Sequence, residues 1–364
     1  MKNPKILIFG ATGVLGVKLI NFLHKKNILV TTAIAYKNFK KLDKIQSRFN
    51  VKNIFCLSDK NDKNFIIKEI RSTQFDIIYF LDNGIDSLSF LRLSLKINKN
   101  SQYCIANKEL IITGGTPLIH SIKKNNFFIP LDSEHFSMFD FLNYDIEKIK
   151  KVYITASGGP FYFKKNINFD NAPLKKVINH PKWKMGEEIS INSSNFVNKI
   201  LEMIELSIIF EIPMEKIDFL ISKQAKVHSV ILLHDGRYIF NIFNNEMLIP
   251  LLKPFENYNF NFSKKIKIEN YKDYKVEFRS DKRFKIFKKL NSVRKFDHKK
   301  RILFLLLNKK AHELYKIKFL NYNSIVDFIF NNIDKFNYKY KLSNFDDIIE
   351  YYDHTKIKIQ QKFN

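Results

Sequence analysis

Two patterns of apolar and polar positions take turns along the first third of the chain. Short apolar runs such as KILIFG (5–10) and FDIIYFL (75–81) have the length of buried strands. The stretch VKLINFLHKK (17–26) has the spacing of an amphipathic helix. Strand and helix patterns that alternate in this way predict a parallel sheet covered by helices on both faces. We therefore expect an α/β fold in this part of the chain.

The pattern changes after Asp132. Several strand-like runs then combine with one long helical pattern over 193–210, which predicts an α+β domain. Residues 257–278 are charged, aromatic and without a clear period, as is typical of a linker, and helical spacing returns after them. The predicted division is 1–132 for the α/β domain, 133–256 for the α+β domain, 257–280 for a linker and 281–364 for a small C-terminal helical domain.

The length of 364 residues is enough for two or three domains. No stretch approaches the roughly 18 unbroken apolar residues of a membrane-spanning helix. The apolar run KILIFG follows Met1 too closely for a signal peptide, so we expect a cytoplasmic protein without a membrane partner. Cys56 and Cys104 lie in strand-like runs, which is typical of buried cysteines rather than of a zinc site or a disulfide.

The formal net charge of +26 suggests a polyanionic partner such as nucleic acid. The lysines, however, are spread along the whole chain and form no single basic block. The charge therefore argues only weakly for nucleic acid, although it suits phosphorylated small ligands.

A glycine-rich turn, GATGVLG (10–16), follows the first predicted strand and opens the first predicted helix. Glycines at this place let the backbone approach a pyrophosphate at the helix N-terminus, which predicts a Rossmann-like dinucleotide-binding domain. The alternative is a turn that only packs the strand against the helix. After the second strand, the segment YKNFKK (36–41) offers cations where an NAD site usually has an acid, which favours NADPH over NADH.

An acidic pair, Asp132 and Glu134, closes the run FFIPLD. If this end of the strand is extended, the two carboxylates point to the same face and could share a metal ion. Hard oxygen ligands suit Mg²⁺ or Mn²⁺ better than zinc. The alternative for such a pair is a solvated turn or a helix cap.

A second polar cluster is expected on the helix of the α+β domain. Asn198 and Lys199 lie four and three residues before Glu202, so all three share one helical face that could hold a phosphate near a metal. The alternative is an ordinary surface salt bridge. The glycine loop TASGGPF (155–161) could cradle an anion with its backbone N–H groups.

In their order, these motifs resemble those of the 1-deoxy-D-xylulose 5-phosphate reductoisomerase family. The motifs that carry the resemblance are GATGVLG (10–16), ANKE (106–109), DSEH (132–135), SGGPF (157–161), HPKWKMG (180–186) and NKILE (198–202). The resemblance is dense from residue 1 to about residue 240 and moderate over the terminal helices. It implies a dinucleotide-binding domain, a catalytic domain with a mobile flap at 180–186, a C-terminal helical domain and a homodimer.

The resemblance also implies roles for individual residues. The metal ligands would be Asp132, Glu134 and Glu202, which together with Lys108 form the catalytic set, and the ion would be Mn²⁺ or Mg²⁺, with Co²⁺ as a further option. The substrate would contact Ser133, Glu134, Ser157, His180, Trp183, Ser193, Asn198, Lys199 and Glu202. NADPH would contact Gly10, Thr12, Gly13, Val14, Leu15, Lys37, Asn38, Asn107, Glu109 and Gly186.

The implied activity is the conversion of 1-deoxy-D-xylulose 5-phosphate to 2-C-methyl-D-erythritol 4-phosphate in the non-mevalonate isoprenoid pathway. The family mechanism is a retro-aldol and aldol rearrangement followed by hydride transfer from NADPH. The sequence departs from the family pattern at Tyr36, where a glycine is usual, at Glu187 and Glu188, where a basic pair is common, and at Ser222, where a histidine is expected.

Two alternatives stay open at this point. One is a different NADP-dependent two-domain dehydrogenase that shares only the nucleotide-binding half, and the motifs of the second half argue against it. The other is a nucleic-acid-binding protein on a decayed enzyme scaffold, suggested by the charge and by the lost glycine and histidine. The polar site residues that remain argue against this second alternative.

Overall fold

The computed structural model describes residues 3–141, 146–165, 167–170, 172–179, 186–244, 246–258, 275–277, 281–336 and 338–363. The chain groups into two compact units. Unit 1 comprises residues 1–111, 118–139 and 244–268, and unit 2 comprises residues 112–117, 140–243 and 269–364. The predicted α/β class of the first part and the α+β and helical character of the remainder are confirmed.

Unit 1 is built on a six-stranded parallel sheet in the order β3-β2-β1-β4-β5-β6. The strands are β1 (Ile6–Phe9), β2 (Thr32–Ala35), β3 (Asn53–Cys56), β4 (Ile77–Phe80), β5 (Gln102–Ile105) and β6 (Phe127–Pro130). The order reverses between β1 and β4, so the carboxyl ends of these two strands form the place where open α/β sheets bind ligands.

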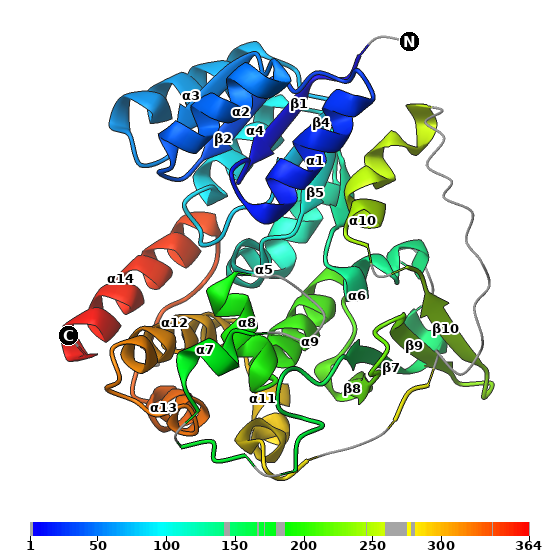
Figure 1. Ribbon diagram of the computed structural model, residues 1–364, viewed down its shortest axis with the longest axis vertical. Helices are drawn as coiled ribbons and strands as arrows, with labels where there is room; N and C mark the ends of the chain where they lie inside the picture. Colours follow the sequence, from blue (N-terminus) through cyan, green and yellow to red (C-terminus); the bar gives the residue numbers. More distant parts are fainter. Residues whose placement is uncertain are drawn as a thin grey trace. The chain divides into compact units, whose positions relative to one another are not determined.

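Helices cover both faces of this sheet (Figure 1). They are α1 (Val14–Lys25), α2 (Phe39–Phe49), α3 (Lys60–Ser72), α4 (Leu88–Ile97) and α5 (Lys108–Lys123), with the short α6 (Ser133–Phe136) after β6. Side chains alternate between the faces of a strand. Ile8 and Tyr79 accordingly share a buried cluster with α1 and α2, whereas Phe9 stacks on Phe80 and contacts Phe90 of α4.

The face under α1 and α2 also receives a segment from much later in the chain. Helix α10 (Leu248–Leu252) and the 3₁₀ segment η4 (Lys253–Tyr258) bury Leu251 and Phe255 in the same cluster. The hydroxyl of Tyr79 donates to the carbonyl of Leu251 at 2.6 Å. On this face the ring of His24 in α1 contacts the ring of Phe49 in α2 edge to face, with ring centroids 5.4 Å apart. The predicted boundaries at 132/133 and 256/257 therefore do not coincide with the units, because apolar side chains draw this later segment back to unit 1.

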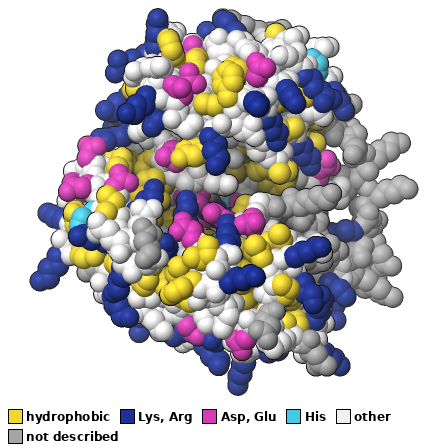
Figure 2. Space-filling view, turned by 60° about the vertical axis from the view of Figure 1, so that its left-hand side comes forward, with side chains coloured by type: hydrophobic (Ala, Val, Ile, Leu, Met, Phe, Trp, Pro, Cys, Tyr) yellow, Lys and Arg dark blue, Asp and Glu magenta, His cyan; other side chains and the backbone are white. Residues whose placement is uncertain are grey.

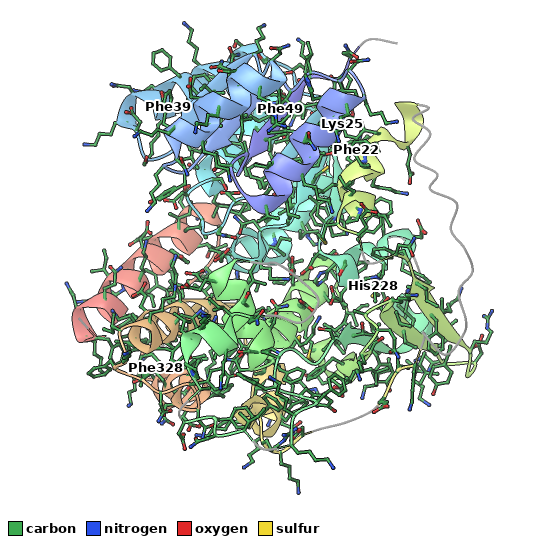
Figure 3. The ribbon with its side chains drawn as sticks, viewed as in Figure 1. Phe22, Lys25, Phe39, Phe49, His228 and Phe328 are labelled. Atoms are coloured by element: carbon green, nitrogen blue, oxygen red, sulfur yellow. The ribbon has the colours of Figure 1, made fainter. Side chains whose placement is uncertain are left out.

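Unit 2 contains a four-stranded mixed sheet in the order β10-β9-β7-β8. Its strands are β7 (Ile149–Ala156), β8 (Ile217–Ile221), β9 (Val227–Leu233) and β10 (Tyr238–Ile242), with β7 parallel to β8 and antiparallel to β9. The strand-like runs VYITA (152–156), VHSVILLH (227–234) and YIFNIF (238–243), which the sequence predicts in this part of the chain, are confirmed as β7, β9 and β10. His228, which is labelled in Figure 3, lies in β9. Its ring stacks on that of Phe243 with ring centroids 3.9 Å apart.

The single helix predicted over 193–210 is wrong. Two helices occupy this region, α8 (Glu187–Ser194) and α9 (Val197–Phe210). Phe196 separates them in the left-handed conformation, with φ of 65°. A bulky residue rarely adopts this conformation, and here its ring is buried among those of Phe219, Phe284 and Phe287. Tertiary packing therefore breaks a pattern that is continuous in the sequence.

The helical C-terminal part is confirmed. Its helices are α11 (Leu290–Arg294), α12 (His298–Lys316), α13 (Ser324–Asn332) and α14 (Phe345–Phe363), and the short α7 (Leu174–Val177) precedes α8. Most of the predicted linker lies outside the described residues. Both cysteines are buried and free, as expected. Within the described ranges, no helix is long and apolar enough to cross a membrane.

Candidate active site

The glycine turn of unit 1 joins β1 to α1 at the switch point of the sheet. Gly10 has φ of +81°, and a Cβ there would lie 2.4 Å from the backbone nitrogen of Asp82. A Cβ on Gly16 would lie 2.5 Å from the carbonyl oxygen of Gly10. Only glycine fits both positions, and Gly13 is the exposed N-cap of α1. The Gly13 nitrogen itself donates to the Gly10 carbonyl at 3.0 Å. The N–H groups of the first turn of α1, which follow it, are suited to bind a diphosphate.

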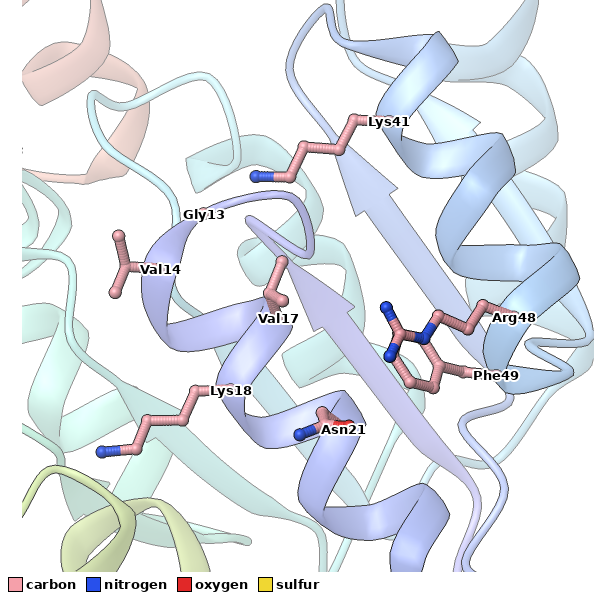
Figure 4. A pocket seen from close by; sticks show the side chains of 8 residues that line it. All are labelled: Gly13, Val14, Val17, Lys18, Asn21, Lys41, Arg48 and Phe49. Carbon is pink, nitrogen blue, oxygen red and sulfur yellow. The ribbon is translucent and has the colours of Figure 1, made fainter.

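The loop after β2 lies beside this turn. Asn38 caps α2 by accepting a hydrogen bond from the backbone nitrogen of Lys41 at 3.1 Å. The Lys41 Nζ in turn donates to the carbonyl oxygen of Thr12 at 2.6 Å, so its side chain reaches the glycine turn (Figure 4). Lys37 and Tyr36 are exposed in the same loop. Sequence reasoning missed the individual role of Lys41, and its only signal was a lysine in the first turn of the helix.

A groove of about 400 Å³ opens next to Gly13 between α1 and α2 (Figure 4). It is lined by Gly13, Val14, Val17, Lys18, Asn21, Lys41, Arg48 and Phe49. Three of these side chains are cationic, and the Arg48 guanidinium lies 5.2 Å from the centre of the Phe49 ring. Of the predicted cofactor residues, Gly13 and Val14 line this groove, whereas Lys37 and Asn38 do not belong to its lining.

Asn107 and Glu109, both predicted cofactor residues, hold the loop that follows β4. The Asn107 side-chain amide donates to the carbonyl of Gly84 at 2.8 Å, and the Glu109 carboxylate accepts from the Gly84 nitrogen at 3.0 Å. The Asn107 Oδ1 also caps α5 by accepting from the nitrogen of Leu110. Both side chains thus fix the loop 81–87 at the switch point.

Asp82 lies in this loop, and sequence reasoning did not select it. Its two carboxyl oxygens are buried and accept no regular hydrogen bond among the described residues. Burial raises the pKa of Asp82 to about 7, although the nearby Ser87 and Asn107 side chains partly oppose this shift. No feature of the local sequence distinguishes this acid from the exposed Asp86 of the same loop.

The acidic pair of unit 1 follows β6, but the chain is not extended beyond Asp132. Asp132 is the N-cap of α6, and Glu134 lies in the first turn of that helix. Their carboxylate oxygens nevertheless lie within 4.8 Å of one another. The Ser133 hydroxyl donates to Glu134 at 2.6 Å, and the Lys108 ammonium pairs with Asp132. The extended geometry was wrong, whereas the helix-cap alternative is correct for Asp132 and is compatible with a shared ion.

The polar cluster of unit 2 lies on the first turns of α9. The Glu202 carboxylate accepts hydrogen bonds from the Asn198 amide and from the Lys199 ammonium, as their spacing predicts. Lys199 is 8% exposed and Glu202 is 2% exposed, so this is not a surface salt bridge. Burial of a charged pair costs desolvation energy that the attraction between the two charges does not always offset. A binding or catalytic role is therefore a reason to consider for this pair.

The glycine loop of unit 2 lies against the end of α8. Gly158 and Gly159 have φ of +92° and +62°, and a Cβ on Gly159 would lie 2.8 Å from the carbonyl oxygen of Ser193. The structure thus brings the loop after β7, which carries Ser157, next to Ser193. Gly186 is the N-cap of α8. His180 and Trp183, with the rest of the predicted flap up to residue 185, lie outside the described residues.

Figure 2 shows one face of the surface coloured by side-chain type. Lysines and arginines are scattered over this face between polar and apolar side chains and do not gather into one patch. A nucleic-acid interface is typically marked by a basic patch or stripe. This face therefore gives no support to the nucleic-acid alternative.

Residues 128–210 match the family of the 1-deoxy-D-xylulose 5-phosphate reductoisomerase C-terminal domain. The 1-deoxy-D-xylulose 5-phosphate reductoisomerase of Pelagibacter ubique (strain HTCC1062) is 31% identical over an alignment 384 positions long, which covers 98% of each chain. That of Malacoplasma penetrans (strain HF-2) is 34% identical over 266 residues, which cover 71% of this chain and 68% of the relative.

Solved structures show the same fold. The reductoisomerase from Zymomonas mobilis in complex with NADPH has a TM-score of 0.83 at 20% identity and covers 100% of both chains. A DOX-P reductoisomerase in complex with NADPH, fosmidomycin and magnesium has a TM-score of 0.84 at 20% identity and covers 99% of this chain and 98% of that chain. With the relationship to the Pelagibacter protein over 98% of its length, the chain belongs to the 1-deoxy-D-xylulose 5-phosphate reductoisomerase family.

Proposed function

We propose that this protein converts 1-deoxy-D-xylulose 5-phosphate to 2-C-methyl-D-erythritol 4-phosphate with NADPH and a divalent cation. The observation that carries the proposal is the close pair of Asp132 and Glu134 oxygens in a chain related to reductoisomerases over its whole length. Neither alternative has comparable support, because the relationship extends through both halves of the chain.

NADPH would supply the hydride for the reduction. Its diphosphate would bind at the glycine turn, where Gly10 and Gly16 keep the backbone accessible. The exposed Lys37 and the α2 cap Asn38 would face the 2′-phosphate of the adenosine. Asn107 and Glu109 contribute by fixing the loop after β4. The complete proposed set is Gly10, Thr12, Gly13, Val14, Leu15, Lys37, Asn38, Asn107, Glu109 and Gly186.

The divalent cation, Mn²⁺, Mg²⁺ or Co²⁺, would polarise the carbonyl and hydroxyl oxygens of the substrate as a Lewis acid. Asp132 and Glu134 provide hard oxygen donors that fit such an ion. We propose Glu202 as the third ligand. Lys108, paired with Asp132, would orient that carboxylate and the substrate next to it, and Ser133 would do the same for Glu134.

The substrate phosphate would be bound by residues of unit 2. Lys199 supplies a buried positive charge, and Asn198 supplies an amide donor on the same helical face. Ser157 and Ser193 would add hydroxyl groups, since the glycine loop lies against the end of α8. Binding energy from this remote group can position the reacting carbons. Contacts of the substrate with His180 and Trp183 stay predictions.

A coupled assay tests the activity. Purified protein should oxidise NADPH, measured by its absorbance, only when 1-deoxy-D-xylulose 5-phosphate and Mn²⁺ or Mg²⁺ are both present. Addition of a chelator should stop the reaction, and addition of excess Mn²⁺ should restore it. Folded, metal-replete protein that binds NADPH but does not turn over this substrate would refute the assignment.

We also propose that the protein is a homodimer, which the family resemblance supports. Sedimentation equilibrium of the purified chain tests this proposal, and a mass near that of one chain of 43.3 kDa would contradict it. The cytoplasmic location stays a prediction.

A further inference from the structure

The loop 81–87 carries the chain from β4 into α4 at the switch point of the unit 1 sheet. The nitrogen of Leu81 donates to the carbonyl of Phe9 at 2.9 Å and so extends the β1–β4 pairing. The next residue, Asp82, has its backbone so close to Gly10 that a Cβ on that glycine would collide with it. Any movement of Asp82 is therefore transmitted to the glycine turn.

Asp82 is half-buried as a residue, but its carboxyl group is shielded from solvent. Both of its carboxyl oxygens, as well as the Ser87 hydroxyl, are buried without a regular hydrogen bond among the described residues. The groups that act on Asp82 are the Ser87 and Asn107 side chains and the charge of Glu109. Glu109 is anionic and already holds the nitrogen of Gly84. No cation of the described residues forms an ion pair with Asp82.

We propose that Asp82 is a positioning residue of the dinucleotide site, whose neutral carboxyl group lets the loop 81–87 pack against the glycine turn. The inference rests on the proposed binding of NADPH. Asp82 does not contact the cofactor. It acts through Gly10, which it touches, and through Asn107 and Glu109, which fix Gly84 in the same loop.

The surroundings of the Asp82 carboxyl group explain why its neutral form is required. An ionised Asp82 would be a buried carboxylate next to the negative Glu109, and both effects are unfavourable. The Ser87 and Asn107 side chains offset only part of this cost. The pKa of about 7 agrees with this view, since burial is the largest cause of its rise. Because the folded loop favours the protonated acid, ionisation as the pH rises through about 7 destabilises this loop conformation.

The dinucleotide should therefore bind less tightly at higher pH. If only the protein with neutral Asp82 binds, the apparent dissociation constant for NADPH should rise about tenfold between about pH 6 and about pH 8. Asp82→Asn keeps the shape of the side chain and cannot ionise. Its dissociation constant should change by less than about twofold over the same range.

The experiment measures NADPH binding by nicotinamide fluorescence, without substrate or metal, at several pH values for three proteins. These are the wild type, Asp82→Asn and, as a matched control, Asp86→Asn. Asp86 is an exposed carboxylate of the same loop, so its variant should keep the pH dependence of the wild type.

Thermal unfolding without NADPH provides a second readout. The stability of Asp82→Asn relative to the wild type should increase as the pH rises from about 4 to about 7 and stay constant above that. In this range Asp82 of the wild type is ionised in the unfolded chain but stays protonated in the folded protein, so the unfolded state of the wild type is favoured. Equal pH dependence of NADPH binding in the wild type and in Asp82→Asn would overturn the inference. Absence of NADPH binding by the folded wild type at every pH would instead refute the proposed cofactor.

Discussion

The two units present their proposed anion-binding groups in different ways. The glycine turn of unit 1 offers backbone N–H groups at the start of α1, and no charged side chain belongs to the turn itself. The cluster of unit 2 is formed by side chains on α9, where Lys199 and Glu202 are buried as a charged pair. One region therefore depends on the shape of the backbone, and the other on the balance of buried charges.

This difference determines which substitutions should harm each region. Backbone N–H groups carry no net charge that must be desolvated, but the turn tolerates no additional atom at Gly10 or Gly16. Buried charges tolerate small changes of shape, but removal of one partner leaves the other unpaired at a cost of several kcal/mol. We therefore expect steric substitutions to be most harmful in unit 1 and charge-neutralising substitutions to be most harmful in unit 2.

The largest effect is expected for Gly10→Ala. The new Cβ would lie 2.4 Å from the Asp82 nitrogen, and alanine disfavours φ of +81°. The variant should lose about 3 kcal/mol of folding stability and all measurable NADPH binding. Thermal unfolding and fluorescence titration measure the two effects.

Gly186→Ala is the control for stability. A Cβ on Gly186 would meet nothing within 4 Å, and the residue has φ of −59°. This variant should unfold at the same temperature as the wild type. Normal NADPH affinity in Gly10→Ala would show that the turn is not the diphosphate site.

The second largest effect is expected for Glu202→Gln. Glutamine keeps the shape but removes the charge that Lys199 and the proposed metal ion require. We expect kcat to fall at least about hundredfold while the circular dichroism spectrum stays unchanged. Glu211→Gln, an exposed acid at the end of α9, should retain the rate of the wild type. A near-normal rate in Glu202→Gln would leave this residue as a structural partner of Lys199 only.

Much of the glycine turn of unit 1 could be predicted from the sequence. A glycine turn between a strand and a helix has a recognisable spacing, and the structure contains it at Gly10–Gly16. The residues of one helical face, such as Asn198 and Glu202, could be predicted for the same reason, since helical geometry fixes which positions are neighbours. These features depend on residues that are close in the sequence.

Other features depend on distant residues and could not be predicted. Phe196 interrupts the helical pattern because rings from other parts of unit 2 surround it. Helix α10 returns to unit 1 because its apolar side chains pack into the cluster that α1 and α2 form on that sheet. The protonation state of Asp82 depends on its burial and on Glu109, which lies 27 positions further along the chain. No local pattern carries this information.

A smaller effect is expected for Lys37→Asp. An acid at this exposed position would repel a 2′-phosphate and could accept hydrogen bonds from ribose hydroxyls instead. The ratio of kcat/KM for NADPH to that for NADH should fall about tenfold. Lys44→Asp, an exposed change on α2, should leave the ratio unchanged. The same ratio in both variants would assign the phosphate contact to another cation.

The smallest effect is expected for Lys41→Met, which tests whether unit 1 depends purely on its backbone. Lys41 does not belong to the glycine turn, but its ammonium donates to the carbonyl of Thr12 and so stabilises the turn from outside. Loss of one such exposed hydrogen bond should weaken NADPH binding only about threefold, since its net contribution is about 1 kcal/mol or less. The effect should be equal for NADH, because the bond acts on the turn that both cofactors share. Arg48→Met, in the same groove but without a bond to the turn, should bind both cofactors like the wild type. A loss confined to NADPH would instead show that Lys41 binds the 2′-phosphate by its charge, and unit 1 would then also depend on a charged side chain.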